Sequence, residues 1–197
     1  TVGIMRPHQI YEHIAFLSSL NFLDIEMHTH NDFGMATANA ISGLEAGAKS
    51  VNTTVIGLGE RAGNASFEQV LMSLTHLFHE QRCIDAAALK EVVQVVEKAS
   101  KQSISASMPI VGKHIFSHES GIHVNGKIKH EKAYEAFSPD EVGMKRSFPI
   151  GKHSGSSTLL YHLRTMGYEP KQEILSQMLP KVREIVTNRK RVLNRKE

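Results

Sequence analysis

Hydrophobic positions follow two different periods along the first 82 residues of the chain. Period-two segments are typical of strands, and repeats of three and four residues are typical of amphipathic helices. The periods predict, in chain order, a helix at 7–20, a strand at 23–28, a helix at 34–47, a strand at 50–56 and a helix that begins after Ser66. Strands and helices that alternate in units of roughly 30 residues are typical of parallel sheets and barrels. Residues 1–82 are therefore expected to form an α/β structure.

Single residues mark the expected ends of these helices. Pro7 is well tolerated in the first turn of a helix, and Gly47 is a typical helix stop. Ser66 is the expected N-cap of the third helix, with Gln69 at the capping-box position.

The hydrophobic pattern changes after residue 82. Asp85 is expected to cap a helix over residues 86–100, and two more helices are expected at 154–166 and 171–191. Pro180 is expected to kink or break the last of them. Residues 108–155 lie between these helices and are rich in Gly, His and Lys without a clear period. An ordered loop of this length is often functional.

Two histidines stand at the end of the first expected strand, in the segment EMHTHND (26–32). Side chains two residues apart on a strand project to the same face, so His28 and His30 are expected to converge. Neutral imidazoles placed in this way are good ligands for a divalent metal ion. The alternative is a pair of hydrogen-bonded histidines at a strand end. Asn31 and Asp32 follow at the carboxyl edge of the sheet, where parallel α/β proteins have their sites.

A glycine-rich segment, GLGERAGNA (57–65), follows the second expected strand. Its glycines permit tight turns and a close approach of the backbone. Glu60, Arg61 and Asn64 bring polar groups to the same edge as the two histidines. A glycine-rich turn between a strand and a helix is also compatible with a phosphate cradle or a plain tight connection, although the spacing is not that of a P-loop.

Composition and charge exclude several classes of protein. The 197 residues are 41% hydrophobic, which suits a globular protein. The single cysteine, Cys83, excludes a disulfide framework and favours a reducing, cytoplasmic setting. No apolar run reaches membrane-spanning length and no signal peptide is expected. The net charge is +3 and the basic excess gathers near the C-terminus. Cations at a helix end suit the helix dipole better than a nucleic-acid arm, since no aromatic residues are interleaved.

Taken together, these motifs resemble one enzyme family. HTHND (28–32), followed by the asparagine of GERAGN (59–64), resembles the metal motif of the 2-isopropylmalate synthase and homocitrate synthase family of metal-dependent TIM barrels. The segment SHESGIHVNGKIKHEKAYEAFSPDEVGMKRSFPIGKHSG (117–155) resembles the post-barrel subdomains of that family. It is most similar to the nitrogen-fixation type of homocitrate synthase. Matching segments cover most of residues 1–168.

The resemblance implies a chain of three parts. Residues 1–82 would be the C-terminal part of a TIM (β/α)8 barrel, from the end of strand six to strand eight. Residues 83–137 would be a linker subdomain with the catalytic loop, and residues 138–197 a helical C-terminal subdomain. The acidic ligand near the family's RDGEQ segment has no counterpart here. The missing strands are expected in cis or on a separate chain, and the family also implies a homodimer.

The implied activity is that of an acyltransferase of amino-acid biosynthesis. Acetyl-CoA would condense with 2-oxoglutarate, and thioester hydrolysis would give homocitrate and CoA. The resemblance assigns His28, His30 and Asn64 to a divalent metal (Mn, Mg or Zn), Thr1 to a carboxylate of the 2-oxo acid, and His123 and Tyr134 to catalysis at the partner subunit's barrel. The candidate contacts of CoA or of the loops are Glu60, Arg61, Lys145, Arg146, Lys152 and His153, with a solvated surface as the alternative for the last four.

Three other functions stay open. A 2-isopropylmalate or citramalate synthase shares GERAGN and the metal site but acts on a different 2-oxo acid. Acyl-CoA lyases of the same superfamily fit less well, because they carry a cysteine in the glycine loop where Glu60 stands here. A non-catalytic dimerisation or regulatory module would retain only part of the metal site. Because the acidic ligand is missing, residues 1–197 alone are expected to lack synthase activity.

Overall fold

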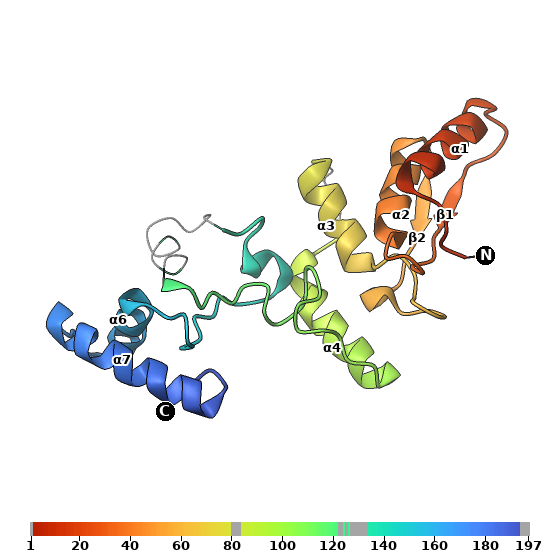
Figure 1. The fold of residues 1–197 in the computed structure, drawn as a ribbon. Coiled ribbons are helices and arrows are strands. Elements are labelled where there is room, and N and C mark those ends of the chain that lie inside the picture. Colours follow the sequence, from red (N-terminus) through yellow and green to blue (C-terminus); the bar gives the residue numbers. More distant parts are fainter. Residues whose placement is uncertain (1, 80–83, 122–123, 125, 127–133, 194–197) are drawn as a thin grey trace. The chain divides into compact units, whose positions relative to one another are not determined.

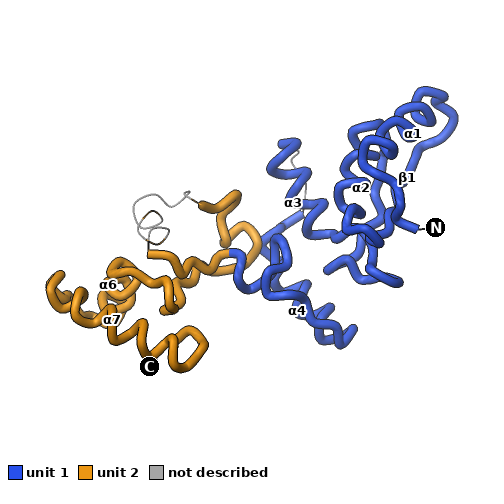
Figure 2. Tube along the Cα trace, in the orientation of Figure 1, with its two compact units in different colours: residues 1–115 blue, residues 116–197 orange. Residues whose placement is uncertain are grey.

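The chain folds into two compact units, Thr1–Ile115 and Phe116–Glu197 (Figures 1 and 2). The computed structural model describes residues 2–79, 84–121, 124, 126 and 134–193. The expectations for Thr1, Cys83 and His123 lie outside these residues. The predicted division at 82/83 and 137/138 stays a prediction.

The first unit is organised around a pair of parallel strands. Its elements in chain order are α1 (Pro7–Ser19), β1 (Glu26–His28), α2 (Ala36–Glu45), β2 (Ser50–Asn52), the 3-10 turn η1 (Val55–Gly57), α3 (Phe67–Leu77), the 3-10 turn η2 (Ala86–Ala88) and α4 (Leu89–Ser100). Helix α2 connects β1 to β2, and Met27 stands opposite Val51 in the parallel register (Figure 1). This order confirms the predicted α/β alternation.

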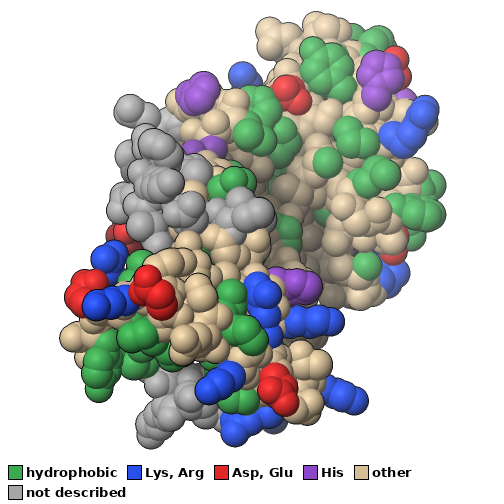
Figure 3. All heavy atoms as spheres, turned by 60° about the vertical axis from the view of Figure 1, so that its left-hand side comes forward, with side chains coloured by type: hydrophobic (Ala, Val, Ile, Leu, Met, Phe, Trp, Pro, Cys, Tyr) green, Lys and Arg blue, Asp and Glu red, His purple; other side chains and the backbone are tan. Residues whose placement is uncertain are grey.

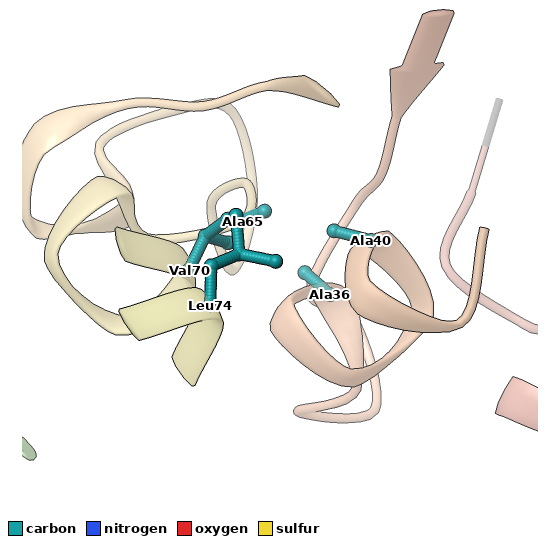
Figure 4. Close-up of a cluster of buried hydrophobic side chains, with 5 residues drawn as sticks. All are labelled: Ala36, Ala40, Ala65, Val70 and Leu74. Atoms are coloured by element: carbon teal, nitrogen blue, oxygen red, sulfur yellow. The ribbon is translucent and has the colours of Figure 1, made fainter. Parts of the chain in front are cut away.

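Small side chains allow α2 to approach α3 closely. Ala36 and Ala40 of α2 form one buried cluster with Ala65, Val70 and Leu74, of which the last two lie on α3 (Figure 4). Ala36 is the first residue of its helix, and Ala65 lies just before α3. The cluster therefore fixes the two helix beginnings, and with them the loops that lead into each helix.

Two local predictions in this unit are wrong. The strand expected over residues 50–56 ends at Asn52, and Ile56 adopts φ 56° inside η1. The carboxylate of Glu68, which is fully buried, accepts a hydrogen bond from the backbone N–H of Ile56 at 3.1 Å. A β-branched residue rarely adopts positive φ on its own. The contact with Glu68 therefore overrides the conformation that the local sequence favours at Ile56. Ser66 is the N-cap of α3, but its side chain makes no capping hydrogen bond.

The expected capping box also fails at its other residue. The Gln69 side chain accepts a hydrogen bond from the Thr37 hydroxyl of α2 at 3.1 Å, so it serves the α2–α3 packing instead. The cap predicted at Asp85 is confirmed. Its carboxylate accepts from the backbone N–H of Ala87 at 2.9 Å, at the start of η2 and ahead of α4.

The second unit contains a helical pair, α6 (Ser156–Thr165) and α7 (Gln172–Arg189), preceded by the 3-10 turn η3 (Pro139–Val142). Of the kink or break predicted at Pro180, the break does not occur, because α7 continues through the proline. Leu175 and Val186, one on each side of the proline, are both buried, so packing holds the helix where one backbone hydrogen bond is lost. Within the described part of the chain, no helix is both long enough and apolar enough to cross a membrane.

Candidate functional site

Two polar loops meet at the carboxyl ends of β1 and β2. We call them the HTHND loop (28–32) and the GERAGN loop (59–64). Main-chain contacts join them: His30 forms a bridge with Asn64, Asn31 N–H donates to Gly63 O at 2.9 Å, and Ala65 N–H donates to Thr29 O at 3.3 Å. The structure therefore brings His28, His30 and Asn64 into one place.

The two imidazole rings lie edge to face. Their centroids are 4.9 Å apart and their planes are inclined at 88°. His28 Nδ1 lies 3.2 Å from Asn52 Oδ1 at the end of β2. An amide oxygen only accepts hydrogen bonds, so Nδ1 is the donor in this contact, and in the neutral ring Nε2 carries the lone pair. In a typical metal-binding histidine, one ring nitrogen donates a hydrogen bond to a protein acceptor, and this bond orients the other nitrogen toward the metal ion.

Asn64 offers a side-chain oxygen that accepts no hydrogen bond from the described residues. Its Nδ2 donates a long hydrogen bond of 3.4 Å to Leu58 O. Its Oδ1 is buried, and no group in the described part of the chain donates a hydrogen bond to it. A buried carbonyl oxygen left in this state costs about 1–3 kcal/mol. A Cβ at Gly59 would lie 2.6 Å from Asn64 Nδ2, so the close packing around this amide requires glycine.

These groups fit a divalent metal ion. Imidazole nitrogens and an amide oxygen are all ligands that such ions accept. Among the described residues no three His, Cys, Asp or Glu side chains are grouped to hold a metal ion. The candidate set therefore consists of His28, His30 and the amide of Asn64.

Asp32 is committed to other partners. Arg61 binds it with two hydrogen bonds, Nε to Oδ1 at 2.8 Å and Nη2 to Oδ2 at 3.2 Å. The backbone N–H of Gly3 donates to Oδ2 at 2.7 Å. The pKa of the Asp32 carboxyl is held well below its usual range; hydrogen bonding to Arg61 is the largest cause, and the bond from Gly3 N–H is the second. The same contact with Asp32 raises the pKa of Arg61. Asp32 thus ties the HTHND loop to the GERAGN loop and to residue 3.

The other loop residues take simpler positions. The Glu60 side chain is 88% exposed, and its carboxylate lies 3.9 Å from Arg61 Nη1. Asp32 binds the guanidinium of Arg61. The backbone of Arg61 has a φ of 54°. Arg61 therefore positions the two loops relative to each other.

Tyr134 stands beside an anchored residue in the second unit. It is 58% exposed and has φ 62°, which few non-glycine residues adopt. Its neighbour Glu135 has a side chain only 3% exposed. Arg146 Nε lies 3.0 and 3.2 Å from the two oxygens of this carboxylate, and His118 Nε2 lies 3.1 Å from it. The network ties the strained Tyr134 backbone to the interior of the unit.

The GKHSG turn, which carries Lys152 and His153, docks on the segment SHESG (117–121). The carboxylate of Glu119 accepts a hydrogen bond from His153 N–H at 2.8 Å. A Cβ at Gly151 would lie 2.2 Å from the Glu119 carboxyl carbon, so a larger residue there would displace this carboxylate. The side chains of Lys152 and His153 are exposed.

Sequence reasoning missed the buried acids. Glu68 and Glu135 lie in segments whose pattern marks acidic residues as exposed, and no motif signals their partners. The pairing of Asp32 with Arg61 is missed for the same reason, because 29 positions separate the two residues.

Comparisons with known proteins bear on both units. Residues 1–96 match the HMGL-like family, and residues 110–190 match a family described as "Homocitrate synthase post-HMGL domain-like". A 2-isopropylmalate synthase 2 from Caldanaerobacter subterraneus subsp. tengcongensis is 46% identical over all of this chain and 51% of its own length. Homocitrate synthase 1 from a Nostoc species is 44% identical over all of this chain and 52% of its own length. A 2-phosphonomethylmalate synthase from Streptomyces rubellomurinus is 40% identical over 93% of this chain and 49% of its own length. The chain spans about half the length of these curated relatives.

Proposed function

The chain carries an HMGL-like segment followed by a homocitrate synthase post-HMGL domain-like segment, and we propose that it forms part of a metal-dependent synthase that condenses acetyl-CoA with a 2-oxo acid. The observation that carries the proposal is the convergence of His28, His30 and the unsatisfied Asn64 Oδ1 at the edge of the parallel strands. 2-Oxoglutarate is the substrate that the sequence favours. The 2-oxo acids of isopropylmalate and citramalate synthases are the alternative, and identities of 46% and 44% to synthases of two types do not separate them.

The chain's own residues would prepare the site for the ion. Asn52 holds the His28 ring with Nε2 available, and Gly59 permits the close approach of the Asn64 amide. The Asp32–Arg61 pair holds the two loops together. The bound ion would supply a Lewis acid that withdraws electron density from the keto carbon of the 2-oxo acid.

Tyr134 is the proposed proton donor or acceptor in the second unit, together with His123. The methyl group of acetyl-CoA is a very weak acid, so its deprotonation needs a placed base and a donor for the developing enolate oxygen. The strained backbone of Tyr134 and its exposed ring support this role, because strain of this kind gathers at functional sites. The role of His123 rests on the resemblance alone.

We propose that the acidic metal ligand comes from outside residues 1–197, in cis or from another chain. In this proposal residues 1–82 form the last strands of a TIM barrel. In the described part of the chain β1 pairs with β2 and with no other strand, so its other edge is open. Phe22 and Leu23, just before β1, are 81% and 86% exposed. An open strand edge beside large exposed apolar side chains is typical of a surface that another element covers.

A complementation assay tests the proposed function. Residues 1–197 are assayed alone, and then mixed with or fused to the part of the Caldanaerobacter relative that this chain does not match. Release of CoA from acetyl-CoA is followed with 2-oxoglutarate, 2-oxoisovalerate or pyruvate and a divalent metal ion. We expect turnover only in the complemented form, and with one of the three acids preferred.

Two results of this assay would contradict the proposal. Turnover by residues 1–197 alone would show that no outside ligand is needed. A complemented protein that binds metal and folds, yet releases no CoA with any of the three acids, would favour the non-catalytic module.

Replacing Asp32 with asparagine should weaken the binding of a divalent metal ion by about 10-fold, as is typical when a residue that orients metal ligands is lost. The ligands themselves remain in Asp32→Asn, but the loops lose the Arg61 pair that joins them. Calorimetric titration with Zn²⁺ measures the effect. Asp24→Asn, at an exposed aspartate before β1, makes the same charge change and is the control. Equal losses in both variants would mean that only the total charge matters.

A further inference from the structure

A basic cavity lies in the second unit, between the GKHSG turn and the end of α7. Its volume is about 390 Å³, within the range of small-molecule sites. The walls include the cationic residues Lys152, Lys190 and Arg191, the imidazole of His153, the carboxylate of Glu119 and the apolar Val192. Lys and Arg side chains gather in the lower part of the face drawn in Figure 3.

The charges of the described residues that line this cavity do not cancel. The three permanent cations face one carboxylate and the C-terminal end of α7, which carries about half a negative charge. A net positive field therefore remains inside a concave surface, where low-dielectric walls strengthen it. The helix dipole explains why cations are tolerated here, but it accounts for less than one of them.

The groups that face the cavity differ in how far they are committed. The Glu119 carboxylate is occupied by the backbone N–H of His153 and packs against Gly151. Among the described residues, no hydrogen bond or ion pair engages the side-chain ammonium groups of Lys152 and Lys190. Two ammonium groups, with an exposed apolar wall at Val192, suit an anion attached to an organic group.

We propose that this cavity binds the phosphate group of a small phosphorylated organic molecule. The proposal does not depend on the condensing activity. CoA is one of the phosphorylated molecules that the cavity could bind. Lys152 and Lys190 supply the charge, the two chain segments of the cavity fix their separation, and Val192 contacts the organic part.

Inorganic pyrophosphate is the first probe, titrated into the full chain by calorimetry at fixed ionic strength. Lys152→Met and Lys190→Met keep the aliphatic stems and remove one charge each from exposed positions. Each should weaken pyrophosphate binding by about ten-fold or more, the loss typical of one charge-assisted hydrogen bond. Lys171→Met is the matched control, because Lys171 is the N-cap residue of the same 18-residue helix, about 27 Å from its other end. It should leave the affinity within about two-fold.

The proposal is overturned if pyrophosphate does not bind, or if Lys171→Met weakens binding as much as the other two variants. A second series separates the sources of the phosphate. If CoA binds more tightly than adenosine 3′,5′-bisphosphate and loses affinity in Lys152→Met, the cavity belongs to the substrate. If the two bind alike, the cavity serves another phosphorylated molecule. Binding without synthase turnover would sink the proposed function alone, and turnover without binding would sink this inference alone.

Discussion

Replacing His30 with alanine should weaken Zn²⁺ binding by this chain by at least about 100-fold, since a directly coordinating residue outweighs the 10- to 100-fold typical of its supporting partners. His30 lies at the bridge between the two loops, where it faces both His28 and Asn64. With three protein ligands in the candidate set, the loss of one leaves two, and two donors rarely hold a divalent ion against water. His28→Ala should have a similar effect.

The three proposed ligands should contribute unequally to metal affinity. Asn64→Ala removes the neutral amide and should cost less metal affinity than either histidine, about 10-fold or more. It should also relieve the strain of an unsatisfied buried oxygen and leave the metal-free fold no less stable. His8→Ala is the control, because its side chain is 78% exposed on α1 and it belongs to no candidate site. If His8→Ala and His30→Ala weaken Zn²⁺ binding equally, the ion binds without a defined site.

Part of the fold follows directly from the sequence because the relevant forces are local. Period-two and helical patterns predict β1, α2, β2 and α3 in the correct order, with ends that differ by a few residues. The pattern fails at Ile56, where the buried carboxylate of Glu68 holds a conformation that isoleucine would not choose. Such a contact joins residues whose relation no short window contains.

The candidate site also has one feature that the sequence predicts and one that it does not. HTHND and GERAGN each follow a strand, and the carboxyl ends of parallel strands share one edge, so their meeting could be predicted. The bidentate pair of Asp32 and Arg61 could not, since either residue alone reads as an ordinary solvated charge. The sequence offered Asp32 as one more polar group of the motif. The structure assigns it to Arg61 and leaves an amide oxygen as the third donor of the set.

Removing the carboxylate of Glu135 should lower the free energy of unfolding by about 3–5 kcal/mol, the cost typical of breaking a buried ion pair. The Glu135 side chain is 3% exposed and that of His118 is 9% exposed, so water solvates neither of them well. Arg146, at 26%, would also lose its partner in Glu135→Ala. Urea unfolding followed by far-ultraviolet circular dichroism measures the loss. Glu184→Ala removes an exposed acid from α7 and should change the stability by less than about 0.5 kcal/mol.

A second variant separates charge from shape at this position. Glu135→Leu combined with Arg146→Met fills similar volume with apolar groups, and such replacements of buried ion pairs are often close to neutral. If the double variant regains most of the stability lost in Glu135→Ala, the penalty came from the uncompensated charge of Arg146. The φ of 62° at Tyr134 would then depend on packing around residue 135 and not on its charge. If the double variant is as unstable as Glu135→Ala, the carboxylate is needed to hold the Tyr134 backbone in its strained conformation, and the network serves the proposed catalytic residue directly.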